Sequence, residues 1–419
     1  MADRAVVALA ATEFEGDNFV VFELIDDRDF HRCALDKRCA DMEIGSVRNK
    51  KDFRDFDCRT RFDIEFLDLN LVSGLDAVLF PACLNNCVCH KMISFGRRVQ
   101  ENEGTKNFCK SKNAVHQKKM RSQMKHRVLI LGSHGRLAGS LLEYWSGMDH
   151  VIGLARPALD VADGTALRQL LRDFEFDVLV NGTGLTNVDR CELATDEAWR
   201  VNVLAPEIMA ECASQRSARL IHFSTDYVFD GLQREPYSEA DIPSPQGWYG
   251  TTKLEGEKRV LQCDPRHIVA RVSWVFGPAK PSFVDTLIDR ARLEDRVEAI
   301  ADKFSCPTSA TDAAAWIECF FDSSISGGLY HLCNSGSCSW REYGVMALQL
   351  AANAGLKLRT TEVEPIRLAD MKQFIAPRPV FSMLSTHKFA AATGITPRHW
   401  REALRDYIHK KYAPISSST

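Results

Sequence analysis

The residues with the clearest potential for catalysis lie between Ser224 and Lys253. Tyr249 and Lys253 are four positions apart in a segment rich in helix formers, so both project from one face of a helix. A free tyrosine titrates near pH ~10, and a fixed ammonium beside it favours the phenolate and lowers that pKa. Tyr249 would then be a usable general acid at neutral pH.

Thr225 completes this set. Leu220 to Phe223 is a short apolar run typical of a buried strand, so Ser224 and Thr225 fall where the strand ends and face a cleft. A hydroxyl at Thr225 could hold a ketone in line with the tyrosine. The three residues predict reduction of a ketone by a nicotinamide hydride. The alternative is that the Tyr-x-x-x-Lys spacing arises by chance and the pair only packs.

A glycine-rich turn predicts the phosphate-binding site of a dinucleotide. The apolar run from Val128 to Leu131 reads as a buried strand, and the turn leads from it into a helical pattern. Gly132 permits the tight turn, Gly135 lets backbone approach a pyrophosphate, and Ala138 keeps the helix close to the sheet. The predicted cofactor contacts from this turn are Gly132, His134, Gly135, Arg136 and Leu137.

The end of the second strand predicts which nicotinamide cofactor binds. An acidic side chain there accepts bonds from a ribose 2'-hydroxyl, whereas a cation suits a 2'-phosphate. Val151 to Ala155 reads as the second strand, and Arg156 follows it. The sequence therefore favours NADP and leaves NAD open, the alternative being that Arg156 is a solvated loop residue. Asp160 and Val161 are predicted to meet the adenine.

Strands and helices continue to alternate along the chain. Phe176 to Asn181 reads as a third strand, a helix is expected from about Asp196 to Gln215, and another strand ends at Ser224. Such alternation predicts an α/β fold of Rossmann type, a doubly wound parallel sheet covered on both faces. The small-residue loop after the third strand supplies three further predicted cofactor contacts, Thr183, Gly184 and Thr186. Asn202 either ties its helix to a strand or is solvated.

Length and composition predict a globular protein with an atypical beginning. The chain has 419 residues, of which 45% are apolar and 26% charged. Residues 1–123 show no stable periodicity, and the chain turns basic and polar before the strand signal at Val128. We expect residues 1–123 to be a poorly ordered extension, 124–280 the Rossmann domain, 281–412 mainly a smaller substrate-binding lobe with elements returning to the Rossmann domain, and 413–419 a tail.

Several classes of function are disfavoured. A net charge of -3 gives no basic footprint for nucleic acid. The chain has no apolar run long enough to span a membrane and no good signal peptide, so we expect no membrane contact and a cytoplasmic location. Fourteen cysteines in such a chain read as reduced thiols. The Cys83, Cys87, Cys89 and His90 spacing matches no zinc pattern, and no metal site is predicted.

With these residues in place, the chain from Met124 to about Tyr412 resembles the extended short-chain dehydrogenase/reductases, and among them the dTDP-4-dehydrorhamnose reductase family. The resemblance covers the whole module after residue 123. The motifs that carry it are the G-x-x-G-x-x-A turn at Gly132, the Ser-Thr-Asp-Tyr-Val-Phe run at 224–229, Tyr249 with Lys253, Arg271-Val272-Ser273-Trp274-Val275, Pro307-Thr308, Tyr330-His331-Leu332, and Arg378-Pro379 with Ser382 and Leu384.

The resemblance implies NADPH-dependent reduction of a nucleotide-linked 4-keto-6-deoxysugar, the last step to dTDP-L-rhamnose, with Lys253 holding the nicotinamide ribose. A homodimer is left open. The substrate-binding residues implied are Asp226, Val228, Phe229, Trp274 and Arg378. Trp274 could instead pack in the core, and Arg378 could cap a helix. The alternatives in function are another sugar-nucleotide reductase or epimerase, and a non-catalytic NADP-binding relative like the regulatory subunit of methionine adenosyltransferase.

Two stretches depart from the family pattern. Asn181-Gly182-Thr183-Gly184 stands where the family usually has Asn-Ala-Ala-Ala, and the small residues still leave room for a cofactor. Asp302-Lys303-Phe304-Ser305-Cys306 stands where many members have Asp-Gln-x-Gly before Pro-Thr. Lys303 leaves open the details of substrate binding, and also the Mg²⁺ that some members use at a dimer contact.

Overall fold

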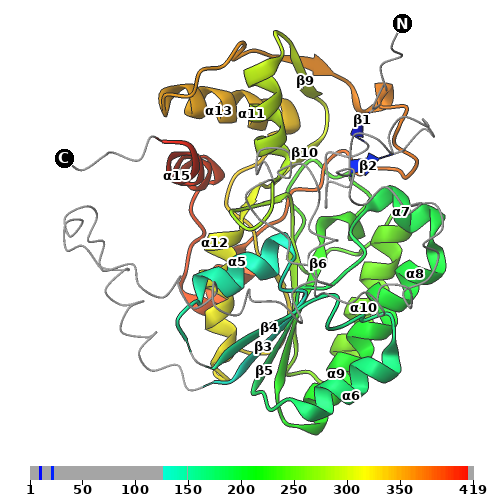
Figure 1. Cartoon of the computed structure of the whole chain (residues 1–419). Coiled ribbons are helices and arrows are strands. Elements are labelled where there is room, and N and C mark those ends of the chain that lie inside the picture. The colour runs from blue at the N-terminus through cyan, green and yellow to red at the C-terminus, as the bar shows by residue number, and fades with distance from the viewer. Residues whose placement is uncertain (1–8, 12–19, 23–125, 149, 414–419) are drawn as a thin grey trace, which may run out of the picture. The chain divides into compact units, whose positions relative to one another are not determined.

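The computed structural model describes residues 9–11, 20–22, 126–148 and 150–413 (Figure 1). In the first 123 residues it describes two short strands, β1 (Leu9–Ala11) and β2 (Val20–Phe22), which pair antiparallel. The rest of the expected extension, including the cysteines near residue 87, lies outside the described residues. The expected domain boundary at 123 therefore stays a prediction.

A six-stranded parallel sheet forms the centre of the fold, in the order β12-β7-β6-β5-β3-β4. All four residues of β3 and of β5 are buried, as expected for strands covered on both faces. The predicted α/β doubly wound fold is confirmed. The strands are β3 (Val128–Leu131), β4 (Val151–Leu154), β5 (Val178–Asn181), β6 (Arg219–Thr225), β7 (Ile268–Val272) and β12 (Gly328–His331).

Helices cover the two faces of this sheet, as Figure 1 shows. On one face, α6 (Gly164–Asp173), α9 (Ala205–Gln215) and α10 (Trp248–Cys263) pack over alternate strand residues such as Leu129, Leu179 and Leu220. On the other face lie α5 (Arg136–Tyr144) and α12 (Ala310–Ile317), which pack against each other. One leucine from each of these three neighbouring strands thus contributes to the same core layer, because successive side chains of a strand point to opposite faces.

The helix expected from Asp196 to Gln215 is formed by three successive segments. They are α8 (Thr195–Trp199), a π-helical turn at Arg200–Leu204, and α9. α7 (Val188–Leu193) precedes them, after the loop that follows β5. A π-helical turn inside a helix often marks a functional site, and this one carries Asn202.

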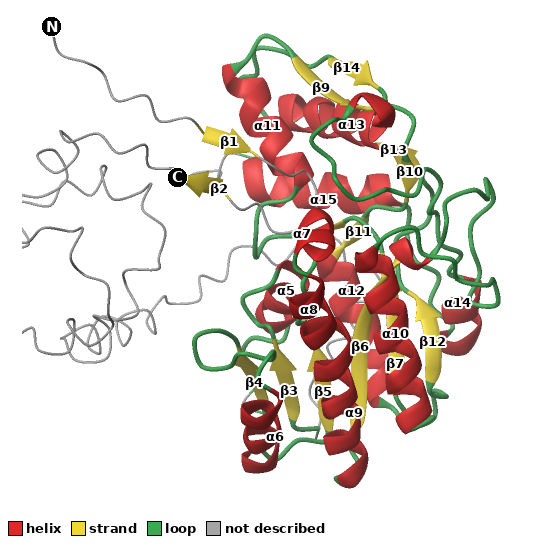
Figure 2. Ribbon diagram, turned by 90° about the vertical axis from the view of Figure 1, so that its right-hand side faces the viewer, coloured by secondary structure: helices red, strands yellow, loops and turns green. Residues whose placement is uncertain are grey.

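A smaller lobe with its own core follows the strand β7 (Figure 2). Three helices, α11 (Phe283–Leu293), α13 (Trp340–Asn353) and α15 (Trp400–Tyr412), pack around a parallel pair of strands, β9 (Val297–Ile300) and β14 (Val363–Ile366). The remaining elements are β8 (Val275–Phe276), β10 (Phe304–Ser305), β11 (Thr308–Ser309), β13 (Cys338–Ser339), α14 (His387–Thr393) and 3-10 turns at Asp226–Val228, Glu318–Phe321 and Leu368–Asp370.

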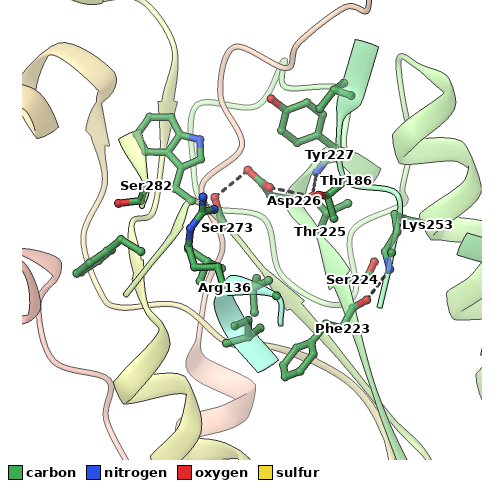
Figure 3. A pocket seen from close by; sticks show the side chains of 18 of the residues that line it. Arg136, Thr186, Phe223, Ser224, Thr225, Asp226, Tyr227, Lys253, Ser273 and Ser282 are labelled. Carbon is green, nitrogen blue, oxygen red and sulfur yellow. Dashed lines mark hydrogen bonds between the residues drawn. The ribbon is translucent and has the colours of Figure 1, made fainter. Parts of the chain in front are cut away.

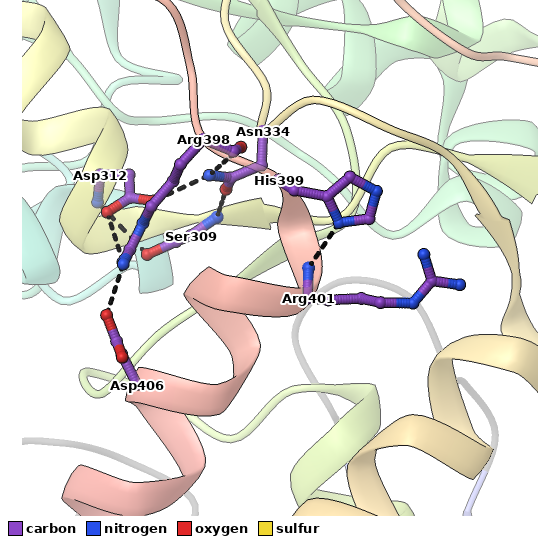
Figure 4. Close-up of polar contacts among 7 residues, drawn as sticks. All are labelled: Ser309, Asp312, Asn334, Arg398, His399, Arg401 and Asp406. Carbon is purple, nitrogen blue, oxygen red and sulfur yellow. Dashed lines mark hydrogen bonds and ion pairs between the residues drawn. The ribbon is translucent and has the colours of Figure 1, made fainter.

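A polar network fixes the start of the helix α15 against the helix α12 (Figure 4). The Arg398 guanidinium donates to both carboxylate oxygens of Asp312, at 2.8 and 2.9 Å, and pairs with Asp406. Asn334 donates to Asp312 at 2.7 Å and accepts from the backbone N–H of Ser309 at 2.8 Å. Because α12 packs on α5, these bonds tie the last helix to the layer that covers the sheet.

Among the described residues, none of the helices combines the length and the apolar character that a membrane span requires.

Candidate active site

The site lies where the chain reverses its direction of travel across the sheet. β4 follows β3 on one side, whereas β5 lies on the other side of β3. At such a switch point the loops leaving two neighbouring strands diverge and open a crevice at their carboxyl ends. A cavity of about 230 Å³ is found there, lined by the turn after β3, the loop after β5 and the end of β6.

Glycines allow the two phosphate-side loops to approach at backbone distance. Gly132 has φ +80°, and a Cβ on it would lie 2.7 Å from the carbonyl oxygen of Gly182. A Cβ on Gly182 would lie 2.5 Å from that of Ala138. Side chains larger than hydrogen would therefore push the loops apart. The predicted role of Ala138, keeping the helix α5 close to the sheet, agrees with this contact.

The helix α10 carries the predicted catalytic pair into the cavity. Tyr249 and Lys253 both line it and are 9% and 4% exposed. A Cβ on Gly250 would lie 2.2 Å from the carbonyl oxygen of Tyr227, so only glycine lets the start of the helix reach the turn that follows β6. The ring of Tyr249 packs edge-on against Tyr227 at 5.6 Å between centroids. The structure thus brings Tyr249, Lys253 and Thr225 to one cavity, as the sequence predicts.

Burial makes Lys253 an unusually weak base for a lysine. Desolvation lowers the pKa of its ammonium to about 8, although the carboxylate of Glu257 and the thiol of Cys191 favour the charged form. The ammonium donates to the carbonyl oxygen of Phe223 at 2.6 Å. Its Nζ also lies 3.4 Å from Nε2 of His222. Lys253 is therefore mostly protonated at neutral pH but holds its proton loosely.

A buried imidazole lies between this lysine and the loop after β5. Nδ1 of His222 is 2.9 Å from the side-chain nitrogen of Asn181. The side-chain oxygen of Asn181 accepts from the backbone N–H and the hydroxyl of Thr183, at 2.9 and 2.6 Å, so the amide nitrogen faces the imidazole. Burial, and then the Lys253 charge, lowers the pKa of His222 far enough to keep it neutral. The sequence analysis missed His222, although a polar residue within a buried strand was a visible signal.

Asn202 fixes the same loop from the helical side. It is fully buried, its side-chain oxygen accepts from the backbone N–H of Leu185 at 2.9 Å, and its nitrogen donates to the hydroxyl of Thr252 at 3.1 Å. A Cβ on Gly256 would lie 2.3 Å from the Asn202 carbonyl oxygen. Of the two alternatives for Asn202, the solvated one is wrong. The residue joins the loop after β5 to the helix α10.

The Thr225 hydroxyl is already engaged on both sides. It accepts from the backbone N–H of Tyr227 at 3.2 Å and donates to one carboxylate oxygen of Asp226 at 3.2 Å (Figure 3). The other Asp226 oxygen accepts from three hydroxyls, those of Ser273 at 2.9 Å, Ser305 at 2.9 Å and Ser382 at 2.6 Å. Asp226 therefore lines the cavity as a buried carboxylate held by hydroxyl groups.

Aromatic rings from the smaller lobe form another wall of the cavity lined by Tyr249 and Lys253 of the helix α10. Trp274 adopts a left-handed backbone conformation with φ +40° and lines the cavity with three rings that the sequence analysis missed, Phe283, Trp340 and Tyr343. Trp274 Nε1 and Tyr343 Oη are buried and have no hydrogen-bond partner among the described residues. A strained backbone and unpaired donors are features of ligand sites. Burial raises the pKa of Tyr343, so its hydroxyl stays a donor.

Lys303 lies behind this aromatic wall. Its side chain is fully buried, and its Nζ is 5.1 Å from the ring centroids of Tyr227 and Trp274 and 5.8 Å from that of Trp340. These three rings line the cavity. A cation over the faces of aromatic rings is attracted by their quadrupoles. Lys303, the residue that departs from the family pattern, thus supports three of the rings that line the cavity.

Three residues implied as substrate contacts lie away from the cavity lining. Val228 and Phe229 are fully buried in a neighbouring apolar cluster, where Phe229 stacks on Tyr237 at 4.1 Å. Arg378 makes a two-pronged ion pair with Asp189, with both distances 2.9 Å. Arg378 thus joins the C-terminal segment to the helix α7 rather than capping a helix.

The predicted cofactor residues divide into two groups. Those that line the cavity are Gly135, Arg136, Leu137, Thr183, Gly184, Thr186, Tyr249 and Lys253. Gly132, His134, Arg156, Asp160 and Val161 are not part of the lining. Of these, His134, Arg156 and Asp160 are exposed. In the part of the chain that the structure describes, no group of His, Cys, Asp and Glu side chains is arranged to hold a metal ion.

Comparison with known proteins identifies the family. The family model described as the RmlD substrate binding domain matches residues 125–413. The chain belongs to the RmlD, or dTDP-4-dehydrorhamnose reductase, family. It is 32% identical over 286 residues to the spore coat polysaccharide biosynthesis protein SpsK of Bacillus subtilis, covering 68% of this chain and 98% of that protein. It is also 32% identical to the dTDP-4-dehydrorhamnose reductase of Aggregatibacter actinomycetemcomitans, covering 67% of this chain and 97% of that protein.

A solved structure agrees with the sequence comparison. The crystal structure of dTDP-4-dehydrorhamnose reductase from Bacillus anthracis in complex with NADP has a TM-score of 0.63 and 26% identity, covering 69% of this chain and all of that chain. The family model extends from residue 125 to residue 413 and so includes both the Rossmann sheet and the smaller lobe. This member of the RmlD family is an NAD(P)-dependent oxidoreductase, a sugar-nucleotide reductase.

Proposed function

We propose that this protein uses NADPH to reduce a nucleotide-linked 4-keto-6-deoxysugar, and that its substrate is dTDP-4-dehydrorhamnose. The observation that carries the proposal is one cavity that joins Thr225, Tyr249 and Lys253 to a glycine-lined crevice at the switch point of the sheet. The relatives named dTDP-4-dehydrorhamnose reductase support the choice of substrate. SpsK, with another printed name, supports the alternative of a different sugar-nucleotide reductase or epimerase.

The residues present fit a nicotinamide dinucleotide. Gly132 and Gly182 let the two loops that line the crevice meet at backbone distance, because a Cβ on Gly132 would lie 2.7 Å from the Gly182 carbonyl oxygen. Gly135 is the N-cap of the nine-residue helix α5, and Gly135, Arg136 and Leu137 line the cavity, so the start of this helix suits a pyrophosphate. Thr183, Gly184 and Thr186 would pass along the cofactor, and Lys253 would hold its ribose hydroxyls. When bound, NADPH supplies the hydride.

Tyr249 is proposed as the proton donor. Reduction of a ketone builds negative charge on its oxygen, so a donor already in place acts in the transition state. The ammonium of Lys253, on the same helical face, stabilises the phenolate that remains. Thr225 would hold the ketone in line, and to donate to it the hydroxyl must turn from Asp226.

The aromatic wall is proposed as the sugar side of the site. Rings present flat apolar surface to the C–H face of a sugar, and the unpaired Trp274 Nε1 and Tyr343 Oη could donate to its hydroxyls. Trp274 would therefore line the sugar pocket, with Tyr343 beside it. Asp226 would contribute through Thr225 rather than through a free carboxylate.

An assay of the purified full chain tests the proposed function. NADPH consumption should be saturable with dTDP-4-dehydrorhamnose, generated enzymatically, and the product should be dTDP-L-rhamnose by chromatography. UDP-linked and 4-keto-free dTDP sugars serve as matched controls. NADPH that binds without being oxidised by any of these sugars would contradict the reductase assignment and favour the regulatory relative.

A second test concerns the choice of cofactor. Arg156 follows the strand β4 and is exposed, so a 2'-phosphate could reach it. Arg156→Ala is expected to raise the Kd for NADPH by about 10-fold or more and to leave that for NADH nearly unchanged, because a charge-assisted contact to phosphate is worth roughly 1.5–3 kcal/mol. Lys258→Ala, which removes another exposed cation, is the control. Equal changes in the Kd values for NADPH and NADH would show that Arg156 does not bind the 2'-phosphate.

A further inference from the structure

Ser224 carries a buried hydroxyl that makes no hydrogen bond to the described residues. It lies near the end of the strand β6, is 3% exposed and lines the cavity. Its Oγ has no hydrogen-bond partner among the described residues. The next residue differs, because the Thr225 hydroxyl both donates and accepts. A buried hydroxyl without a partner is costly, so its presence facing a cavity points to a bond made by a ligand.

The position of Ser224 shows which ligand it would meet. Lys253 donates to the carbonyl oxygen of Phe223, the residue before Ser224. Tyr249 lies one helical turn earlier and packs on Tyr227, beyond Thr225. The lysine therefore lies level with Ser224, and the tyrosine lies level with the residues that follow it. Figure 3 shows Ser224 beside Lys253, whereas Thr225 is grouped with Asp226 and Tyr227.

We propose that the Ser224 hydroxyl binds the nicotinamide ribose end of the cofactor, opposite Lys253, and fixes its orientation. This inference rests on the proposed function, in which Lys253 holds the same ribose. Ser224 is a positioning residue for the cofactor and takes no part in proton transfer. Trp274 and Tyr343, whose unpaired donors lie on the aromatic wall, remain for the sugar.

Titration of the full chain with NADPH, without any sugar, tests the assignment. Ser224→Ala is expected to raise the Kd for NADPH by about 3- to 10-fold, the effect of losing one neutral hydrogen bond. Thr225→Ala, the matched change one residue along, should leave the Kd near wild type and lower turnover. Thermal unfolding distinguishes cofactor binding from a structural role of Ser224. Without cofactor, Ser224→Ala should have the Tm of wild type, since the Ser224 hydroxyl bonds no described residue. With the same NADPH concentration added to both, the Tm of the variant should rise less than that of wild type.

The outcomes distinguish this proposal from the proposed function. If Ser224→Ala binds NADPH with the wild-type Kd, the assignment is overturned. This holds whether turnover is kept or lost, and lost turnover would indicate that the hydroxyl binds the sugar instead. If wild type binds NADPH but reduces none of the sugars, the proposed reductase function fails, while the Ser224 comparison still decides this proposal. If wild type binds neither NADPH nor NADH, both fail.

Discussion

Tyr249→Phe is expected to lower kcat by about 10²–10⁴-fold, the usual contribution of a positioned general acid. The substitution removes the phenol hydroxyl and leaves the ring packed against Tyr227. NADPH affinity should therefore stay near its wild-type value, and the loss should appear equally in kcat and kcat/KM. Steady-state kinetics together with NADPH titration measure both quantities.

Tyr237→Phe provides a matched control for this change. Tyr237 is also buried, but its hydroxyl donates to Asp230 at 2.7 Å and the residue does not line the cavity. Tyr237→Phe removes the same phenol hydroxyl at a position outside the cavity, so kcat should stay near its wild-type value. Wild-type turnover in Tyr249→Phe on the true substrate would make Tyr249 a packing residue and the catalytic assignment wrong.

Lys253→Met is expected to reduce both kcat and NADPH affinity. The ammonium is proposed to stabilise the Tyr249 phenolate and to bind the ribose hydroxyls of the cofactor. Loss of a charge-assisted hydrogen bond to the ribose should raise the Kd for NADPH by about 10- to 100-fold. The variant should remain folded. The lowered pKa means that the folded state holds the lysine proton less tightly than the unfolded chain, so removing this buried charge offsets the lost bond to Phe223.

The pH dependence of the wild type checks the same assignment. Lys253 loses its charge as pH rises through about 8, so kcat/KM should fall on the alkaline side from that value rather than from the ordinary value near pH ~10.4. A profile of kcat/KM that stays flat to pH ~10 would contradict the role assigned to the charged Lys253. A Lys253→Met variant with altered kcat but wild-type NADPH affinity would show that Lys253 does not bind the ribose.

Eight of the predicted cofactor residues line the cavity, and the sequence could bring them together because the signals around them are local. β3, β5 and β6 are short apolar runs, and Gly132 and Gly135 lie directly after one of them. Tyr249 and Lys253 share a helical face through their spacing alone. Each of these features needs only a few neighbouring residues to be recognised.

The aromatic wall of the cavity could not be predicted from local signals in the same way. Phe283, Trp340 and Tyr343 come from two helices of the smaller lobe and meet Trp274 only when that lobe folds onto the sheet. Phe229 illustrates the opposite error. It follows Asp226 closely in sequence, yet a 3-10 turn at Asp226–Val228 intervenes, and its ring points into a separate cluster.

The bonds around Asp226 have a consequence for the synthesis of the protein. Its carboxylate gathers hydroxyls from Ser273, Ser305 and Ser382, the last of which is 156 residues further along the chain. A ribosome that has finished the Rossmann strands up to β7, which ends at Val272, has not yet made any of these three donors. The buried charge beside Thr225 thus lacks its partners until the C-terminal segment emerges. A nascent or truncated chain ending before Ser382 should therefore lack one of the hydroxyls that hold Asp226 beside Thr225.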